Sequence, residues 1–232
     1  MYRLILLLLI LLITLVEPAW SQADGDRNAM NFEPGPFTSL YLKGGYKVTL
    51  KQGKKFEITA KARSHDIFDD LVVENQNGHV YITTNRDLFH YEGVALYITF
   101  PDLNELNIEG GVNLNTFGYL KLSDFSMYVN GGAKIDLEVT AENIDIEGEG
   151  GFLFDLKGVT SNLSVRISGA GTVDADELKA QVVDFTIEGF GTGSVHALET
   201  LNATIHGVGK IRYKGNPQLT KNIDGLGVLK RE

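Results

Sequence analysis

Carboxylates that follow glycine residues are the first side chains in this sequence that could do chemistry. Asp136, Asp155, Asp174 and Asp176 carry oxygen ligands of the kind that suits Ca²⁺. Calcium-binding β-rolls repeat a short Gly-Gly-x-Gly-x-Asp unit. The repeat in this chain is longer, 17 to 21 residues, and the aspartates do not keep one distance from the glycines assigned to it. We therefore predict solvated surface aspartates and no metal site.

A second group of carboxylates surrounds Gly148 and consists of Glu142, Asp145, Glu147 and Glu149. Two carboxyl groups held about 5 to 9 Å apart can hydrolyse a glycosidic bond, with one of them kept protonated by its surroundings. Asp145 and Glu147 alternate on the polar side of a predicted strand, where nothing in the sequence desolvates either group. A polysaccharide-active enzyme remains an alternative, but we predict no catalytic residues.

The other residues with catalytic or ligating chemistry do not form motifs. The chain contains no cysteine, which excludes disulfides, thiolate metal sites and cysteine catalysis. The histidines lack metal-ligand spacings such as His-x-His; they are His65, His79, His90, His196 and His206. The Gly-x-Gly segments at Gly169 and Gly189 precede no predicted helix, so they do not indicate nucleotide binding. We predict no cofactor.

Exposed aromatic side chains are the best candidates for ligand contacts. Tyr119, Tyr128 and Phe190, with Tyr213, could form a platform for sugar rings, because aromatic faces pack against apolar CH surfaces. The alternative is that Tyr213 points into the core and Phe190 only covers a turn. We name Tyr119, Tyr128 and Phe190 as candidate ligand-binding residues.

The elements that position these side chains form a repeat over residues 104–231. Alternating apolar and polar residues, a Gly or Gly-x-Gly and renewed alternation recur at Gly110, Gly131, Gly148, Gly169, Gly189, Gly207 and Gly225. Of the 21 positions two, four and six residues before these glycines, 18 are apolar. A strict period of two predicts strands with one buried face. Glycine permits the sharp corner between two such strands.

Two all-β architectures fit this repeat. In a right-handed parallel β-helix each copy is one coil, whereas in an antiparallel meander each glycine corner is a hairpin turn. The apolar phase is the same on both sides of every corner, which favours stacked coils. We predict a right-handed parallel β-helix, or β-solenoid, of about seven short glycine-cornered coils with an N-terminal β cap.

Several segments of the repeat resemble a bacterial family, the putative auto-transporter adhesin head GIN domain. The resemblance is carried by Ser168-Gly-Ala-Gly-Thr-Val-Asp-Ala, Gly189-Phe-Gly-Thr-Gly-Ser-Val, Gly207-Val-Gly-Lys-Ile-Arg-Tyr and the opening Phe37-x-x-Leu-x-Leu-x-Gly. It runs from about Phe37 to Arg231 and implies a secreted or envelope-located right-handed β-solenoid without a catalytic motif. In the early copies Gly-Gly replaces Gly-x-Gly, so we expect less regular coils there.

The N-terminus has the features of a signal peptide over residues 1–21. Arg3 precedes an apolar run from Leu4 to Val16, which is 13 residues long and too short to cross the roughly 30 Å core of a bilayer as a helix. The small residues Ala19 and Ser21 suit a cleavage site. We expect an exported protein of the periplasm, outer envelope or extracellular space, with no stable membrane span after cleavage; the alternative is an uncleaved anchor.

The mature chain is predicted to be one GIN-type domain over residues 37–232 after a flexible lead at 22–36. Within it, residues 37–100 form a β cap region and 101–232 the repeat array. Asn77-Gly78 lies between two alternating segments and predicts a hairpin. A cap is expected because the first coil would otherwise expose an unpaired strand edge.

Composition limits the partners. The formal net charge is −9 and the pI about 5.1, which argues against nucleic acid as a partner. The predicted role is non-catalytic, adhesin-like binding of glycans or envelope proteins. Besides the enzyme alternative, a structural or assembly module of the envelope also fits the sequence.

Overall fold

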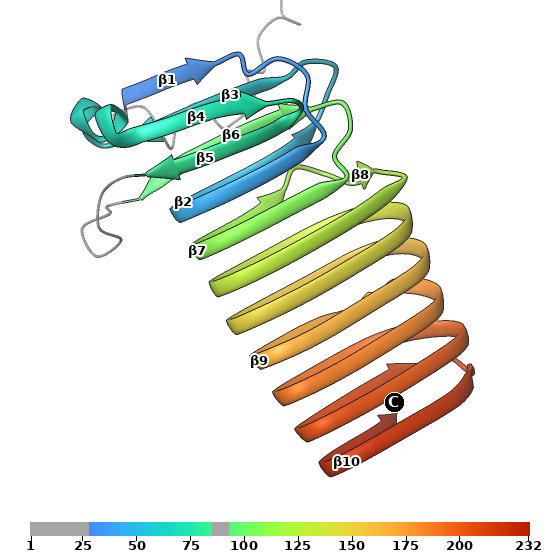
Figure 1. Ribbon diagram of the computed structural model, residues 1–232. Coiled ribbons are helices and arrows are strands. Elements are labelled where there is room, and N and C mark those ends of the chain that lie inside the picture. The colour runs from blue at the N-terminus through green and yellow to red at the C-terminus, as the bar shows by residue number, and fades with distance from the viewer. Residues whose placement is uncertain (1–27, 85–92) are drawn as a thin grey trace, which may run out of the picture.

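The chain is all-β (Figure 1). The computed structural model describes residues 28–84 and 93–232, so the predicted signal peptide, part of the predicted lead and His90 lie outside the described residues. The strands are β1 (Asn28–Phe32), β2 (Ser39–Gln52), β3 (Glu57–Ala62), β4 (Leu71–Gln76), β5 (His79–Thr84), β6 (Val94–Phe100), β7 (Glu105–Thr116), β8 (Leu120–Lys121), β9 (Asp124–Lys214) and β10 (Gln218–Arg231). One 3-10 helix, η1 (His65–Asp70), precedes β4.

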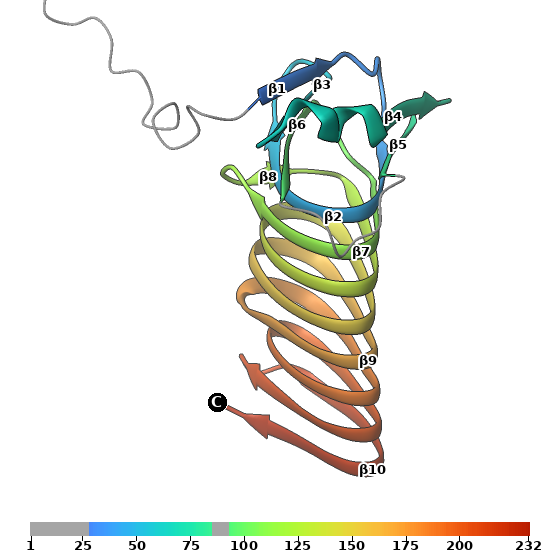
Figure 2. The same cartoon turned by 90° about the vertical axis from the view of Figure 1, so that its left-hand side faces the viewer.

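Neighbouring copies of the repeat pair in parallel. β2 pairs with β7, β7 with β9 and β9 with β10, each in parallel register. Within β9 the chain turns repeatedly, and each turn lies on the one before it (Figures 1 and 2). The glycine corners are therefore not hairpin turns, and the antiparallel meander is wrong for these strands. Along the path from β1 to β10 the sheet stays open.

One glycine from each turn lies directly on the glycine of the turn before, and we call this set the glycine column. Its members are Gly44, Gly110, Gly131, Gly150, Gly169, Gly189, Gly207 and Gly225. Their φ angles lie between +99° and +159°, where side chains are strained. From Gly110 onward, a Cβ would also come within 2.9 Å of the backbone of the preceding column glycine. Glycine is required at these corners by conformation and by space.

The third corner of the array is at Gly150, so the assignment of that corner to Gly148 was wrong. Gly148 has no positive φ and is buried on the inner side of the turn. A Cβ at Gly148 or at Gly171 would run into the ring of Phe152, which is only 3% exposed. The large ring thus takes up the space that two glycines leave, as close packing of a core requires. Because Gly148 and Gly150 are two residues apart, the alternation alone could not show which of them forms the corner.

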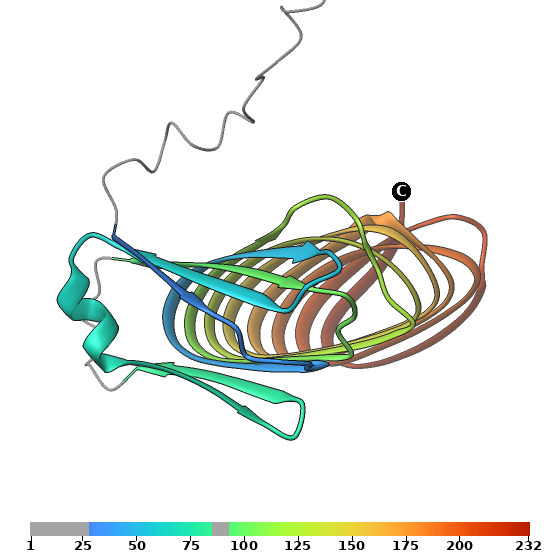
Figure 3. The same cartoon turned by 90° about the horizontal axis from the view of Figure 1, so that it is seen from above.

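The core lies inside the turns. In the straight parts of β9 between the corners, alternate residues are buried, as in Val183, Phe185 and Ile187, each of which is 0% exposed. This confirms the predicted apolar face. In the view from above, the turns enclose this interior (Figure 3).

The N-terminal strands adjoin the turn formed by β2. Gly44 pairs with Gly110, so β2 is itself a glycine-cornered copy within the segment predicted as a cap region. β6 pairs with β2 in parallel, and β3 and β1 follow in antiparallel pairs. β4 and β5 form the predicted antiparallel hairpin, with positive φ at Asn77 (55°) and Gly78 (88°). At the other end of the array, β10 lies at the end of the sheet path.

Candidate binding site

A groove on the N-terminal strands combines aromatic, hydroxyl and charged side chains. We call it the N-terminal groove, and its volume is about 430 Å³. It is lined by Thr49, Lys51, Glu57, Thr59, Tyr97, Ile98, Thr99 and Phe117. A volume of this size falls within the range of small-ligand sites.

Strand pairing brings these residues together. Tyr97 of β6 pairs with Thr59 of β3 on one side and with Thr49 of β2 on the other. In the next outward-facing row, Thr99 lies between Glu57 and Lys51. Because alternate residues of a strand share a face, the two rows lie on the same surface of the sheet.

Lysine side chains hold the two rings of the N-terminal groove. The Lys61 ammonium lies 5.2 Å from the centre of the Tyr97 ring, and the Lys51 ammonium lies 5.3 Å from the centre of the Phe117 ring. Phe117 is fixed at its backbone, where its N–H donates to the Leu50 carbonyl at 2.7 Å, yet its side chain is 45% exposed. Such cation–π contacts fix ring orientation and leave charged donors beside the rings. The groove can therefore offer aromatic surface and hydrogen bonds to the same ligand.

The three aromatic residues named from the sequence lie in different places. Tyr119 is 54% exposed and lies two residues after Phe117, between β7 and β8, but it does not line the N-terminal groove. Tyr128 lies on β9, where its hydroxyl donates to Glu149 at 2.9 Å, and this hydrogen bond raises the pKa of Tyr128. Phe190 is 67% exposed and lines a second groove, whose lining includes neither tyrosine. Their role as ligand contacts stays a prediction.

The second groove lies beside the glycine column, and we call it the corner groove. Its volume is about 710 Å³. It is lined by Ala133, Gly151, Phe152, Leu153, Ala170, Gly171, Thr172, Phe190, Gly191, Thr192, Val208, Gly209 and Lys210. The predicted candidate Phe190 is the largest exposed side chain in it. The lining is mainly apolar, in contrast to the N-terminal groove.

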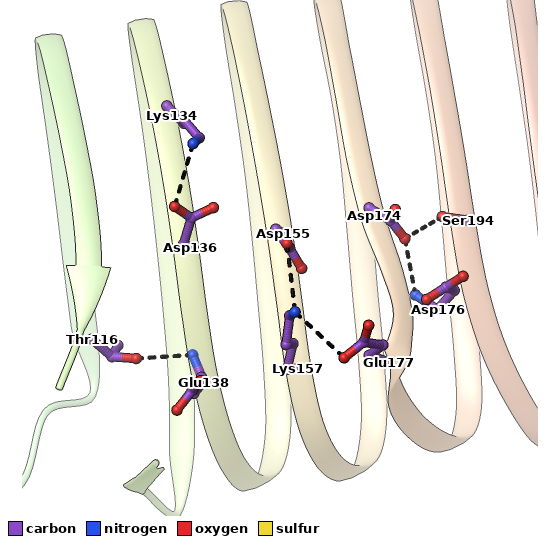
Figure 4. A network of polar contacts seen from close by, with 10 residues as sticks. All are labelled: Thr116, Lys134, Asp136, Glu138, Asp155, Lys157, Asp174, Asp176, Glu177 and Ser194. Carbon is purple, nitrogen blue, oxygen red and sulfur yellow. Dashed lines mark hydrogen bonds and ion pairs between the residues drawn. The ribbon is translucent and has the colours of Figure 1, made fainter. Parts of the chain in front are cut away.

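Three aspartates stack along the outside of β9, and we call them the aspartate column. Asp136, Asp155 and Asp174 each stand five residues after a column glycine, so the expectation that they lack a constant phase was wrong. The error arose because the third corner was assigned to Gly148, which is seven residues before Asp155, whereas the corner is at Gly150, five residues before it. Figure 4 shows the three side chains on successive turns.

Cations and hydroxyls satisfy the aspartate column. Lys157 lies 3.8 Å from Asp155 and 3.4 Å from Glu177, and Lys134 lies 3.6 Å from Asp136 (Figure 4). Ser194, only 2% exposed, donates to Asp174 at 2.5 Å. Ser194 is thus a buried structural hydroxyl.

The aspartates affect one another electrostatically. Partial burial raises the pKa of Asp155, the Lys157 ammonium opposes that rise, and the neighbouring carboxylates Asp174 and Asp136 add to it. Within residues 28–84 and 93–232, no group of three or more histidine, cysteine, aspartate or glutamate side chains could hold a metal ion.

The carboxylates considered for glycoside hydrolysis lie on the outer side of the turn that ends at Gly150. Glu142 and Asp145 are exposed, and Glu149 accepts the hydrogen bond from Tyr128. A general acid of a glycosidase needs an environment that keeps it protonated, such as an apolar pocket. Glu142 and Asp145, being exposed, have no such environment.

The fold and its grooves define a class of protein: an all-β protein whose candidate ligand sites lie on the outer surface of its strands. Residues 36–217 match the family described as "Putative auto-transporter adhesin, head GIN domain", and the chain belongs to this family. The resemblance expected from the sequence is confirmed. No curated protein matches the chain.

Solved structures share this fold. A putative adhesin from Bacteroides fragilis is 19% identical, with a TM-score of 0.83 over 89% of this chain and 97% of that one. A putative adhesin from Parabacteroides merdae is 18% identical, with a TM-score of 0.69 over 90% and 97%. A protein from Parabacteroides distasonis named a putative lipid binding protein is 19% identical, with a TM-score of 0.64 over 90% and 98%. At these identities the likeness concerns the fold.

The sequence missed Tyr97 and Phe117 as candidate ligand contacts. Alternation along Val94–Phe100 does place Tyr97 and Thr99 on one face, which is a usable signal. The signal is incomplete because no local pattern states that β6 lies between β2 and β3. Among the described residues, no helix is long and apolar enough to cross a membrane.

Proposed function

We propose that this protein is a non-catalytic, adhesin-like binding protein, exported or at the cell surface, and that its N-terminal groove binds a glycan. Membership of an adhesin family supports the general role and the location. The observation that carries the ligand class is the pair of rings, Tyr97 and Phe117, in one groove with three threonine hydroxyls, a lysine and a glutamate. Sugars present apolar CH faces and hydroxyls together, and this lining offers partners for both.

The architecture proposed for this role is a right-handed parallel β-helix with an N-terminal β cap. The parallel pairing and the glycine column support stacked coils. Right-handed connections between parallel strands of one sheet are the rule in proteins. β6, β3 and β1 lie beyond the β2 turn and would protect its edge. Such a scaffold is rigid, which favours recognition at a preformed surface.

A second candidate function, an assembly module of the envelope, is favoured by β10. Its outer face carries Leu226 (76% exposed) and Val228 (53%), and Leu219 (41%) lies at an inner position that pairs with the buried Leu201. An unpaired strand edge with exposed apolar residues is a template for strand addition by another protein. Lys221 occupies an inner position that is alanine, Ala203, in the preceding turn. An inward charge of this kind protects an edge against unspecific pairing, so a partner would have to match it.

Glycan binding is tested with an array of bacterial and host glycans, run in calcium and again in EDTA. The wild-type chain is compared with Phe117→Ala and Lys51→Glu in the N-terminal groove, and with Phe190→Ala as an exposed aromatic control outside it. Loss of a phenyl contact worth about 1.5–3 kcal/mol should weaken binding roughly tenfold or more. We expect both groove variants to lose affinity, the control to keep it and EDTA to have no effect.

Three results would contradict the proposal. Absence of selective glycan binding by the wild-type chain would favour the second candidate function, in which β10 binds a protein partner. Equal loss in Phe190→Ala and Phe117→Ala would show that the glycan does not occupy the N-terminal groove. Loss in EDTA would instead indicate a metal-dependent site.

A further inference from the structure

The corner groove has a floor of small residues and a set of exposed apolar side chains. Gly151 and Ala170 follow the column glycines of their turns, and because their side chains are absent or small they form the bottom of the groove. At the same position of the next two turns stand Phe190 (67% exposed) and Val208 (37%), and Leu153 (57%) lies beside the floor. Single exposed apolar residues are ordinary, but several in one groove indicate an apolar ligand.

The length of the corner groove suits one extended hydrocarbon chain. Its lining comes from five successive turns, from Ala133 to Val208. Parallel strands about 4.8 Å apart make this roughly 19 Å. One acyl chain spans about half of the roughly 30 Å hydrocarbon core of a bilayer, or about 15 Å. The polar atoms on the groove do not require a polar ligand, because the hydroxyls of Thr172 and Thr192 bond to each other at 3.0 Å.

The charges along this side of the turns favour an anionic group within the groove. Among the described residues that line the corner groove, Lys210 is the one charged side chain. The lining of the adjoining groove of about 530 Å³ beside the earlier turns includes Lys47 and Lys134, of which Lys134 also pairs with Asp136 at 3.6 Å. This is notable in a chain with 30 acidic and 21 basic residues. Both grooves therefore attract anions on a protein that is negative overall.

The surroundings of the groove disfavour a membrane surface as its occupant. Glu149 precedes a column glycine on one side, and on the other side Asp155 and Glu177 share the cation Lys157. An anionic lipid surface would meet these carboxylates as it approached. A single molecule lying between them would not.

We propose that the corner groove binds a single-chain anionic amphiphile, a fatty acid. Its carboxylate pairs with Lys210, at the turn that contains Val208. Its hydrocarbon chain passes Val208 and Phe190 and runs over Ala170 and Gly151 toward Ala133. This site is separate from the N-terminal groove and does not depend on glycan binding.

The test is titration of the full-length chain with monomeric palmitate by calorimetry, with every variant carrying the same N-terminal segment. We expect saturable binding with one palmitate per chain. Phe190→Ser removes the main apolar contact, and Gly151→Glu places a carboxylate on the open floor, where nothing lies within 4 Å of a Cβ. Each is expected to weaken palmitate binding at least tenfold. The matched controls, Leu198→Ser and Lys179→Glu, change an exposed residue outside the lining and should bind as wild type.

Hexadecanol isolates the contribution of the carboxylate. Lys210→Glu should weaken palmitate binding about tenfold and leave hexadecanol binding unchanged, whereas Phe190→Ser should weaken both. Circular dichroism confirms the fold of each variant, and Gly151 is an open position where nothing lies within 4 Å of a Cβ.

The outcomes are decisive in both directions. Absence of saturable palmitate binding by the wild type, or equal binding by the groove variants, would overturn the proposal. Co-sedimentation with phosphatidylglycerol vesicles without palmitate binding would also overturn it and would indicate a membrane surface. Palmitate binding that is lost only in the groove variants would support it.

Discussion

Replacing Gly150 with alanine tests the steric account of the glycine column. Gly150 has a φ of +99°, and a Cβ at this position would lie 2.5 Å from the carbonyl oxygen of Gly131 in the preceding turn. Its neighbour Gly151 has no positive φ, and a Cβ there would meet nothing within 4 Å. Gly151→Ala is therefore a matched control, one residue away on the same turn.

The two substitutions should have opposite effects on the free energy of unfolding. A non-glycine residue held in a sparsely populated backbone region costs about 1–3 kcal/mol. The overlap with Gly131 adds to this, so we expect Gly150→Ala to lose about 2–4 kcal/mol. Gly151→Ala restricts the unfolded chain without strain and should gain up to about 1 kcal/mol. For a chain of this length, Gly150→Ala should lower Tm by roughly 5–15 °C.

The assay is urea unfolding followed by far-UV circular dichroism, with thermal unfolding as a second measurement. Gly207→Ala, at another turn of the column, should repeat the loss. The reasoning would be refuted if Gly150→Ala and Gly151→Ala differed by less than about 0.5 kcal/mol. Such a result would mean that the turns can shift apart at no cost, and that glycine is not required at the corner.

Further predictions concern packing and pH. Gly171→Ala should cost about 1–3 kcal/mol because its Cβ overlaps the Phe152 ring, and Phe152→Leu in the same chain should recover part of that loss in a double-mutant cycle; additive losses would contradict the contact. Partial burial raises the pKa of Asp155, so the folded state holds this proton more tightly and stability falls as pH rises from about 3.8 through the folded pKa. Asp155→Asn removes that loss, so the Tm of the variant should rise more than the Tm of the wild type when the pH is raised from about 3.5 to neutrality. An unchanged dependence of Tm on pH would contradict this. Hydrogen bonds from Asn107 and Ser39 lower the pKa of Glu105. The ionised Glu105 therefore stabilises the fold at pH values above its usual pKa of 4.5, and this stabilisation is lost as the pH falls through the folded pKa. Glu105→Gln should therefore lose less Tm on acidification than wild type, and a larger loss would show that the sign is wrong.

Local sequence patterns were sufficient to predict the type of structure and much of its local detail. Alternation of apolar and polar residues is set by the two-residue period of a strand, so the buried face of β9 could be read residue by residue. The hairpin at Asn77-Gly78 was predictable because both residues tolerate the positive φ that the turn needs. The family resemblance was also carried by short segments around the glycine corners.

Which residues meet across the turns depends on how the turns pack on one another. Gly148 and Gly150 have the same phase in the alternation, and only contact with the preceding turn and with the Phe152 ring separates them. The same two-residue shift brings Asp155 into line with its neighbours on successive turns. Register between strands depends on contacts between residues far apart in the chain, which no local pattern contains.

Both grooves have the same origin. The N-terminal groove exists because β6 lies between β2 and β3, so that Tyr97 meets Thr49 and Thr59. The corner groove exists because small residues of some turns lie next to Phe190 and Val208 of others. The conformation of each turn follows from local steric constraints, whereas a surface formed by several turns depends on how those turns stack.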